Sequence, residues 1–373
     1  MSSIVIAGDT SGTVTLSAPA VAGTPTLTLP TTTGSLVTSS VSTVTTLSPY
    51  SGFKNRIINP LMAIDQRNAG ASQTITAAAA LAYTIDRWYA YCTGANVTGQ
   101  RVAGAYTSSQ YRYQFTGAAS VTAIGFGQRI EAANSYDLAN TTATLSCYIS
   151  NSLLTSVTWT AYYATTTDTF GTLASPTRTQ IATGTFTVSS TRAQYTASIS
   201  IPSAATTGIE IVFTVGAQTS GTWIIDTVQL EASPTATTFE YRSFGAELAL
   251  CQRYYQKSFS LGTAPADGIN QSSTDGTTLH LFNSYDSGNG FFSPVYFQVK
   301  MRTSPTITFY RSGGNGVTNG VWGTFDSGWT SVTTMTLTTC NDMAFLATGA
   351  RTSAFTTKTA YVGSGTWTAS GEL

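Results

Sequence analysis

Only one stretch of this 373-residue sequence has the apolar spacing of a helix, so the rest of the chain has to be explained by strands and turns. The stretch runs from Ser243 to Lys257, and its apolar residues recur at steps of four, three and four. These residues are Phe244, Leu248, Cys251 and Tyr255. A helix of about four turns is marginal alone. Its apolar side is therefore expected to be buried, either against a β domain of the same chain or against sibling helices around an oligomer axis.

Charged residues are scarce: they make up 9% of the chain, and 17 Lys and Arg balance 17 Asp and Glu. Nucleic acids and anionic membranes are recognised by clustered Lys and Arg, so neither is expected as a partner. No apolar run approaches a membrane span, and the opening MSSIVIAGDTSG has no basic segment followed by an apolar one. We therefore expect synthesis in a cytoplasm, without a secretory signal or membrane insertion.

The first fifty residues alternate Thr or Ser with apolar residues. Thr13–Leu16 is followed by Pro19, and a second such run, Thr26–Leu29, is followed by Pro30. Alternation of this kind predicts short strands, but the segment has too few large side chains to build a core. Residues 1–50 are therefore expected to dock on a larger assembly or to interleave with copies of themselves. A disordered linker is the alternative.

Residues 51–242 contain many short apolar runs separated by Gly, Ser, Asn or Pro, without intervening helices. This pattern predicts an antiparallel β-sandwich of the jelly-roll kind, whose last strand spans Thr222–Glu231. After the expected helix at residues 243–257, β signals return, and residues 258–373 are expected to form a second β domain of the sandwich type. The fold class expected for the chain is thus all-β.

Four aromatic residues of this last domain lie in stretches rich in Gly, Asn and Ser: Tyr285, Trp322, Phe325 and Trp329. Flat rings in such loops are suited to recognition, because they stack on the apolar faces of sugars and have few torsions to freeze. We expect these four residues to contact a receptor. The alternative is that the rings pack the ends of the domain or a subunit contact.

Little in the sequence favours catalysis. The single histidine, His280, lies in an alternating run that predicts an ordinary strand rather than a catalytic triad. Glycoside hydrolysis needs two carboxylates across one cleft. The aspartates of the last domain adjoin Gly, Ser or other turn-prone residues, as is usual in turns, and their spacing singles out no pair. They are Asp267, Asp275, Asp286 and Asp326.

Two sets of residues have the chemistry of metal ligands. The cysteines are widely spaced, which disfavours a zinc site or a disulfide framework and indicates small buried hydrophobes. They are Cys92, Cys147, Cys251 and Cys340. Asp65, Asp86 and Asp226 are oxygen ligands of the type that Ca²⁺ prefers. However, Arg67 and Arg87 accompany these acids and would repel a cation, which favours ion pairs instead. No cofactor is expected.

Several segments resemble tail-fibre or receptor-binding proteins of tailed bacteriophages. They are NRIINPLMAIDQRNAG, DRW at Asp86–Trp88, IDTVQLEASPTATTFEYRSFGAELALCQRYYQKS, MRTSPTITFY, WTASGEL and the Thr-rich opening. The resemblance implies a virion adhesin with an anchoring end, a carbohydrate-binding-like sandwich, a short helical neck and a terminal β domain that meets the host. It supplies no catalytic motif.

We therefore expect a phage virion protein that binds rather than catalyses, assembled as a homotrimer through Phe244, Leu248, Cys251 and Tyr255. The trimer follows from the resemblance together with the apolar stripe. Residues 1–50 would attach to tail or capsid proteins, and a host glycan or protein would be the receptor. Two alternatives stay open: a head fibre or capsid decoration protein, and a surface-glycan depolymerase.

Overall fold

The chain forms two compact units, Met1–Pro49 and Tyr50–Leu373. The structure is a computed structural model. It describes residues 3–7, 13–17, 53–78, 80–268, 278–284, 290–311, 320–325, 329–351 and 361–373.

The described part of the first unit is a β-hairpin. Strand β1 (Ser3–Ala7) pairs antiparallel with β2 (Thr13–Ser17), and Val5 lies opposite Thr15. The strand predicted over Thr13–Leu16 is therefore confirmed. The second predicted run, at residues 26–29, lies outside the described residues.

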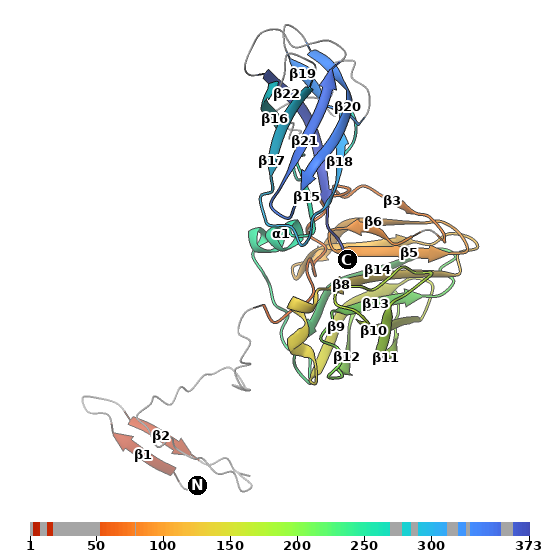
Figure 1. Ribbon diagram of the computed structural model, residues 1–373. Helices are drawn as coiled ribbons and strands as arrows, with labels where there is room; N and C mark the ends of the chain where they lie inside the picture. Colours follow the sequence, from red (N-terminus) through yellow and green to blue (C-terminus); the bar gives the residue numbers. More distant parts are fainter. Residues whose placement is uncertain are drawn as a thin grey trace. The chain divides into compact units, whose positions relative to one another are not determined.

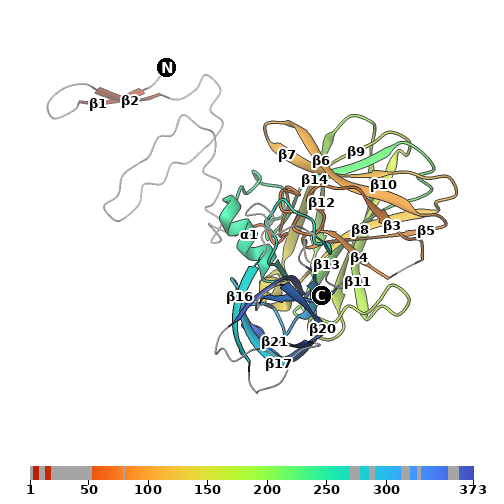
Figure 2. The same ribbon diagram turned by 90° about the horizontal axis from the view of Figure 1, so that it is seen from above.

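Two six-stranded antiparallel sheets form a sandwich in the first part of the second unit (Figures 1 and 2). The strand order is β11-β10-β13-β8-β5-β4 in one sheet and β12-β9-β14-β7-β6-β3 in the other. The strands are β3 (Gln73–Ile75), β4 (Ala82–Ile85), β5 (Trp88–Thr93), β6 (Val97–Tyr106), β7 (Ser109–Thr116), β8 (Ala123–Ile130), β9 (Thr142–Asn151), β10 (Ser156–Ala164), β11 (Arg178–Thr187), β12 (Ala193–Ser200), β13 (Ile209–Val215) and β14 (Thr222–Glu231). The predicted jelly-roll-like sandwich is thus present, and its last strand has the predicted bounds.

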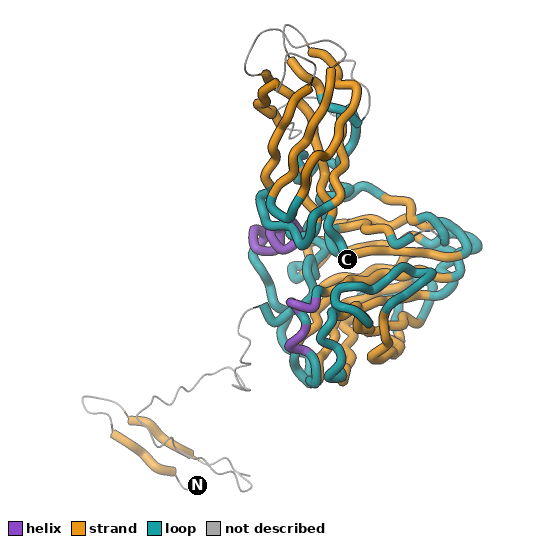
Figure 3. The backbone as a smooth tube through the Cα atoms, viewed as in Figure 1, coloured by secondary structure: helices purple, strands orange, loops and turns teal. Residues whose placement is uncertain are grey.

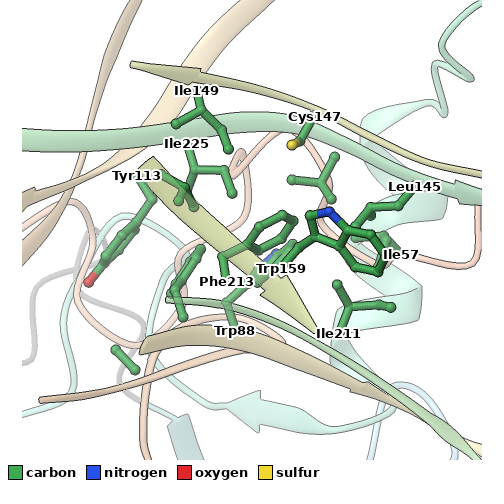
Figure 4. Close-up of a cluster of buried hydrophobic side chains, with 14 of the residues drawn as sticks. Ile57, Trp88, Tyr113, Leu145, Cys147, Ile149, Trp159, Ile211, Phe213 and Ile225 are labelled. Carbon is green, nitrogen blue, oxygen red and sulfur yellow. The ribbon is translucent and has the colours of Figure 1, made fainter. Parts of the chain in front are cut away.

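Aromatic side chains from both sheets share one hydrophobic core (Figure 4). Trp88 of β5 stacks on Phe126 of β8, with ring centroids 4.7 Å apart. Tyr113 of β7, in the opposite sheet, stacks on the same Phe126 at 4.9 Å. Fully burying each such side chain contributes roughly 1.5–3 kcal/mol. These stacks across the sandwich fix which face of each sheet points inward.

The last part of the chain forms an eight-stranded antiparallel sheet around a separate core. Its strands are β15 (Tyr255–Lys257), β16 (Thr278–Ser284), β17 (Gly290–Tyr296), β18 (Thr306–Tyr310), β19 (Gly323–Phe325), β20 (Trp329–Cys340), β21 (Ala344–Arg351) and β22 (Tyr361–Ser370). Because β22 pairs with both β16 and β19, the strands β22-β16-β17-β21-β20-β19 close into a ring. The all-β fold class is therefore confirmed, and the last part of the chain consists of strands as expected.

In the part of the chain that the structure describes, one α-helix and two short 3-10 helices interrupt the strands (Figure 3). The 3-10 helices are η1 (Ala132–Asn134) and η2 (Tyr136–Leu138), and the α-helix is α1 (Phe244–Gln252). Ser243 caps α1, because its hydroxyl accepts from the Ala246 amide at 3.4 Å. Within the described residues, no helix has the length and apolarity needed to cross a membrane.

The helix is shorter than predicted, and its apolar side is covered differently. Tyr255 lies in β15, paired with Ser370 of β22, because strand pairing takes over after residue 253. Cys251 is fully buried against its own chain, in a cluster with Ile58, Ile64 and Tyr254. Phe244, by contrast, is 54% exposed. The four residues therefore do not form one helical stripe. Cys251 and Tyr255 are buried within their own chain and do not line an oligomer axis, and the helix docks on its own chain, the alternative left open by the sequence.

Candidate functional site

The outer surface of the sheet that contains β5, β8, β13, β10 and β11 carries a cluster that we call the tyrosine face. It comprises Tyr89, Tyr91, Tyr162, Arg178 and Glu210. Strand register places its members side by side: Tyr91 lies opposite Gly125, and Tyr162 lies opposite Glu210. Because side chains alternate along a strand, these residues point away from the core that Trp88 and Ile211 enter.

Two glycines of β8 make room for two of the tyrosine rings. A Cβ atom at Gly125 would lie 2.1 Å from the Tyr91 Cζ, and one at Gly127 would lie 2.4 Å from the Tyr89 hydroxyl. Both distances are far below van der Waals contact. The alternation Gly125-Phe126-Gly127 therefore serves both surfaces of the sheet: Phe126 enters the core while the glycines let Tyr89 and Tyr91 lie flat against the strand.

Glu210 holds the charged part of the tyrosine face in place. Its carboxylate is fully buried and accepts from the Tyr89 hydroxyl and the Arg129 Nε, each at 2.8 Å, and from Arg178. The Arg178 guanidinium also lies over the Tyr162 ring, 4.2 Å from its centroid. With three donors, this carboxylate orients its neighbours rather than standing free to move a proton.

Tyr91 and Tyr162 are half-buried, so part of each ring remains accessible beside the fixed arginine. Burial raises the pKa of the Tyr91 hydroxyl, with smaller effects from nearby Arg178 and Tyr162. The hydroxyl therefore stays protonated at neutral pH and can donate a hydrogen bond. Accessible rings next to fixed polar groups suit a neutral ligand that has apolar faces and hydroxyls.

The receptor-contact residues predicted from the sequence are placed differently. Trp322 is fully buried, and its Nε1 donates to the Thr366 carbonyl at 3.1 Å. A Cβ at Gly365 would meet this ring at 1.9 Å, because the indole fills the space that the glycine leaves. The expectation of an exposed Trp322 in a loop is therefore wrong. Phe325 is the last residue of β19 and Trp329 is the first residue of β20, and the backbones of these two residues are strand partners. Tyr285 lies outside the described residues.

Asp65 and Asp86 are engaged by hydrogen bonds, whereas the ion pairs expected with Arg67 and Arg87 are not formed, because both arginines pair with Glu372. Asp65 accepts from the amides of Asn68 and Gly70, and Asp86 accepts from Gln66. Asp226 instead pairs with Arg192. The calcium arrangement of Asp65, Asp86 and Asp226 is therefore not formed. Among the described residues, no group of three or more potential metal ligands occurs.

Another cluster joins the sandwich to the second β domain, and we call it the glutamate joint. It comprises Arg67, Arg87, Tyr254, Tyr255 and Glu372. Glu372 accepts from Arg67 at 2.8 Å and from Arg87. Arg67 lies over the Tyr255 ring at 3.9 Å, and Arg87 lies over the Tyr254 ring at 3.4 Å. The segments that carry the resemblance to phage fibre proteins supply all five residues, so at this point they serve packing.

Other sequence candidates have ordinary structural roles. Asp267 accepts from the amides of Arg311 and Gly320 at 2.7 and 2.9 Å, as expected of a turn aspartate. His280 lies within β16, opposite Gly363. Residues 275, 286 and 326 lie outside the described ranges. All four cysteines are free, and three are buried as expected, while Cys340 is half-buried.

The tyrosine face was not predicted from the sequence, although the sequence contains one pattern that indicates it. Tyr89-Ala90-Tyr91 and Gly125-Phe126-Gly127 alternate with the same period of two. Such a match indicates two adjacent strands with rings on one strand and gaps on the next. Arg178 and Glu210 carry no comparable signal, because only the sheet order brings β11 and β13 to either side of β10.

No protein-family model matches this chain, and no curated protein matches it. Solved structures with partial similarity include the enzymatically active domain of tailspike protein 4 of bacteriophage CBA120, with 16% identity and a TM-score of 0.30 over 50% of this chain and 22% of that chain. Another is TmCBM61 in complex with beta-1,4-galactotriose, with 11% identity and a TM-score of 0.32 over 48% of this chain and 99% of that chain. A third is the C-terminal family 22 carbohydrate binding module of Clostridium thermocellum Xyn10B, with 14% identity and a TM-score of 0.28 over 40% and 89% of the two chains. This chain is thus partly similar to a phage tailspike domain and to carbohydrate-binding modules.

Proposed function

We propose that this chain is a phage virion adhesin that binds neutral host-surface glycans through the tyrosine face. The observation that carries the proposal is the pair of half-buried rings, Tyr91 and Tyr162, near the Arg178 guanidinium, which the buried Glu210 carboxylate holds over the Tyr162 ring. Rings supply stacking area for the apolar faces of sugars, and fixed donors select the orientation of hydroxyls. The virion role rests on the sequence resemblance to phage fibre proteins.

The proposal is for binding without cleavage. Hydrolysis of a glycosidic bond needs one carboxyl to donate a proton and a second one across the cleft. Glu210 already accepts from three donors, and two of them are arginines. These donors engage the carboxylate in positioning its neighbours, and the five residues of the tyrosine face include no second carboxylate.

A host surface polysaccharide, immobilised on a sensor, tests this function with the full-length chain. Wild type should bind, and Tyr162→Ala should weaken binding by at least about tenfold, which is typical for truncating an aromatic at a contact centre. Tyr241→Ala is the matched control, because Tyr241 is 58% exposed and belongs to another segment. Equal binding by all three proteins would contradict the proposed face. Release of reducing ends from the polysaccharide would indicate a depolymerase instead.

The remaining parts of the adhesin proposal are the attachment and the assembly. Residues 1–50 are proposed to attach the chain to the particle, so a chain that begins near Tyr50 should fold but fail to enter virions. Locating the first fifty residues in a particle map distinguishes a tail fibre from a head fibre or capsid decoration protein. A homotrimer stays part of the proposal, with its contacts elsewhere than in the buried Cys251 and Tyr255, and light scattering measures it.

A further inference from the structure

A cavity of about 300 Å³ lies beside the sandwich, away from the tyrosine face, with which it shares no lining residue. The segment around Phe53 and Arg56, the two 3-10 helices, Arg242 and the helix α1 enclose it. Its volume is at the low end of the roughly 300–1,000 Å³ range of small-molecule sites. It is therefore large enough for a ligand of about one sugar ring.

Two aromatic rings line this cavity and remain open to solvent. Phe53 is 56% exposed and Tyr136 is 62% exposed. Ile58, Ala133 and Leu250 add apolar surface to the wall. These side chains lie together around one concave surface, which is the arrangement that small-molecule sites use for apolar contact.

The charges of the cavity are balanced within the protein. Arg56 pairs with Asp137 and also donates to the Phe53 carbonyl at 2.9 Å. Arg242 pairs with Glu240 and Glu247, at 3.4 and 3.2 Å. An anion would find both guanidinium groups neutralised. A cation would find one lining carboxylate, that of Asp137, which is already paired. The cavity therefore favours a neutral ligand.

One polar group of the cavity is only weakly engaged. The Asn134 side chain is exposed, and its Nδ2 is 3.5 Å from the nearest acceptor, the Glu131 Oε2. An amide has both donors and an acceptor, so it can bond to the hydroxyls of a ligand. The backbone around it is fixed, because the Ser135 hydroxyl donates to the Glu131 carbonyl at 2.9 Å and Leu138 is fully buried.

We propose that this cavity is a second glycan site, which takes one neutral pyranose unit. The proposal rests on the two solvent-exposed rings, on the paired charges of the cavity and on the weakly engaged side-chain amide of Asn134. The ring faces of Phe53 and Tyr136 would stack on the apolar face of the sugar, and the Asn134 amide would bond to its hydroxyls. A second site away from the tyrosine face would let one chain hold a branched or long glycan at two points, which raises affinity without strong single contacts.

The test titrates the full-length chain with the methyl β-glycosides of glucose, galactose and N-acetylglucosamine, and with N-acetylneuraminic acid as an anionic sugar. Ligand-observed NMR follows binding. At least one neutral glycoside should bind, and Tyr136→Ala should weaken it by at least about tenfold. Tyr136→Phe, which keeps the ring, should retain most of the affinity. Thermal melting should show both variants folded, because the Tyr136 side chain is mostly exposed.

The tyrosine-face variant Tyr162→Ala separates this inference from the proposed function. If binding of every neutral glycoside is lost in Tyr162→Ala and unchanged in Tyr136→Ala and Phe53→Ala, the cavity proposal is overturned while the tyrosine face stands. If binding is instead lost in Tyr136→Ala and Phe53→Ala and unchanged in Tyr162→Ala, the cavity proposal is supported and the tyrosine-face proposal is contradicted. Absence of neutral binding, or binding of the anionic sugar alone, also overturns the cavity proposal.

Discussion

The tyrosine face and the glutamate joint are built from the same parts. In each, one carboxylate accepts from two arginines: Glu210 from Arg129 and Arg178, and Glu372 from Arg67 and Arg87. In each, at least one of these arginines lies over a tyrosine ring. The residue types alone therefore do not tell which cluster binds a ligand and which one holds the molecule together.

Accessibility separates the two clusters. Tyr254 is fully buried and Tyr255 is 6% exposed, because the sandwich and the second β domain cover them from both sides. Tyr162 and Tyr91 lie on one outer surface of a sheet and are half-buried. Stacking of a guanidinium on a ring stabilises either arrangement. Of the two clusters, only the tyrosine face leaves ring surface accessible to a partner. In the glutamate joint, both tyrosine rings are buried by packing within the chain.

The largest expected effect comes from Arg87→Met in the joint. The change leaves the Glu372 carboxylate with one partner fewer in a buried place, which typically costs about 3–5 kcal/mol. Arg178→Met is the matched change on the tyrosine face, where Glu210 keeps both Tyr89 and Arg129. We expect it to cost about 1–2 kcal/mol. Urea unfolding measures the free energy of unfolding of both variants. Equal losses of stability would contradict the expected difference between the glutamate joint and the tyrosine face.

A pH dependence should distinguish the joint as well. Gln66 Nε2 donates to Asp86 at 2.7 Å and to the Tyr255 carbonyl at 2.9 Å, so Asp86 lies directly behind the joint. Burial raises the pKa of Asp86 from 3.8 to about 6, although Arg67 and Gln66 oppose the change. Well below pH 4 this carboxyl is protonated in both the folded and the unfolded chain. Between about pH 4 and pH 6 the unfolded chain releases the proton while the folded chain keeps it, so the folded state loses stability, and above about pH 6 both states are ionised and the loss levels off.

Comparison with Asp86→Asn isolates this effect, because the variant has no proton to lose. The free energy of unfolding of wild type, minus that of the variant, should fall by roughly 2–3 kcal/mol between pH 4 and pH 6 and then level off. A difference that is flat over this range would show that the buried carboxyl does not titrate there.

A smaller effect is expected from Gly125→Ala beneath the tyrosine face. The new methyl group would lie 2.1 Å from the Tyr91 Cζ and has to push the ring outward. We expect a loss of about 1 kcal/mol of stability together with weaker glycan binding. Gly216→Ala is the control, since a Cβ there meets no atom within 4 Å. If both variants bind glycan as wild type does, the position of the Tyr91 ring is unimportant for recognition.

The strands of the sandwich were predictable because their alternation is local. Residues 222–231 form β14 with the predicted bounds, although the strand is buried on both faces over most of its length and its register with β9 shifts between Asp226 and Gln229. The end of the helix was not predictable in this way: Tyr255 has helical spacing, but the distant β22 pairs with it. Trp322 was misplaced because Gly, Asn and Ser around it indicated a loop, whereas the gap at Gly365 that receives its ring lies 43 residues further on.

Ion pairing of Arg67 and Arg87 was predictable in kind, because guanidinium groups seek carboxylates, but both arginines pair with Glu372 rather than with Asp65 or Asp86. The partner that matters most, Glu372, was not identified, since it lies 305 residues from Arg67. The tyrosine face combines four strands whose order in the sheet differs from their order in the chain. Its charged members could therefore be recognised only after the sheet order was known.

The same substitution in both clusters tests the central claim most directly: Tyr162→Ala on the tyrosine face and Tyr254→Ala in the joint, each measured for glycan affinity and for thermal stability. Tyr162→Ala should lower affinity for the host polysaccharide by at least about tenfold and change stability little. Tyr254→Ala should cost about 3–5 kcal/mol of stability, as for other large buried aromatics, and keep the affinity while folded. Loss of stability without loss of affinity in Tyr162→Ala would contradict the assignment of the tyrosine face to recognition.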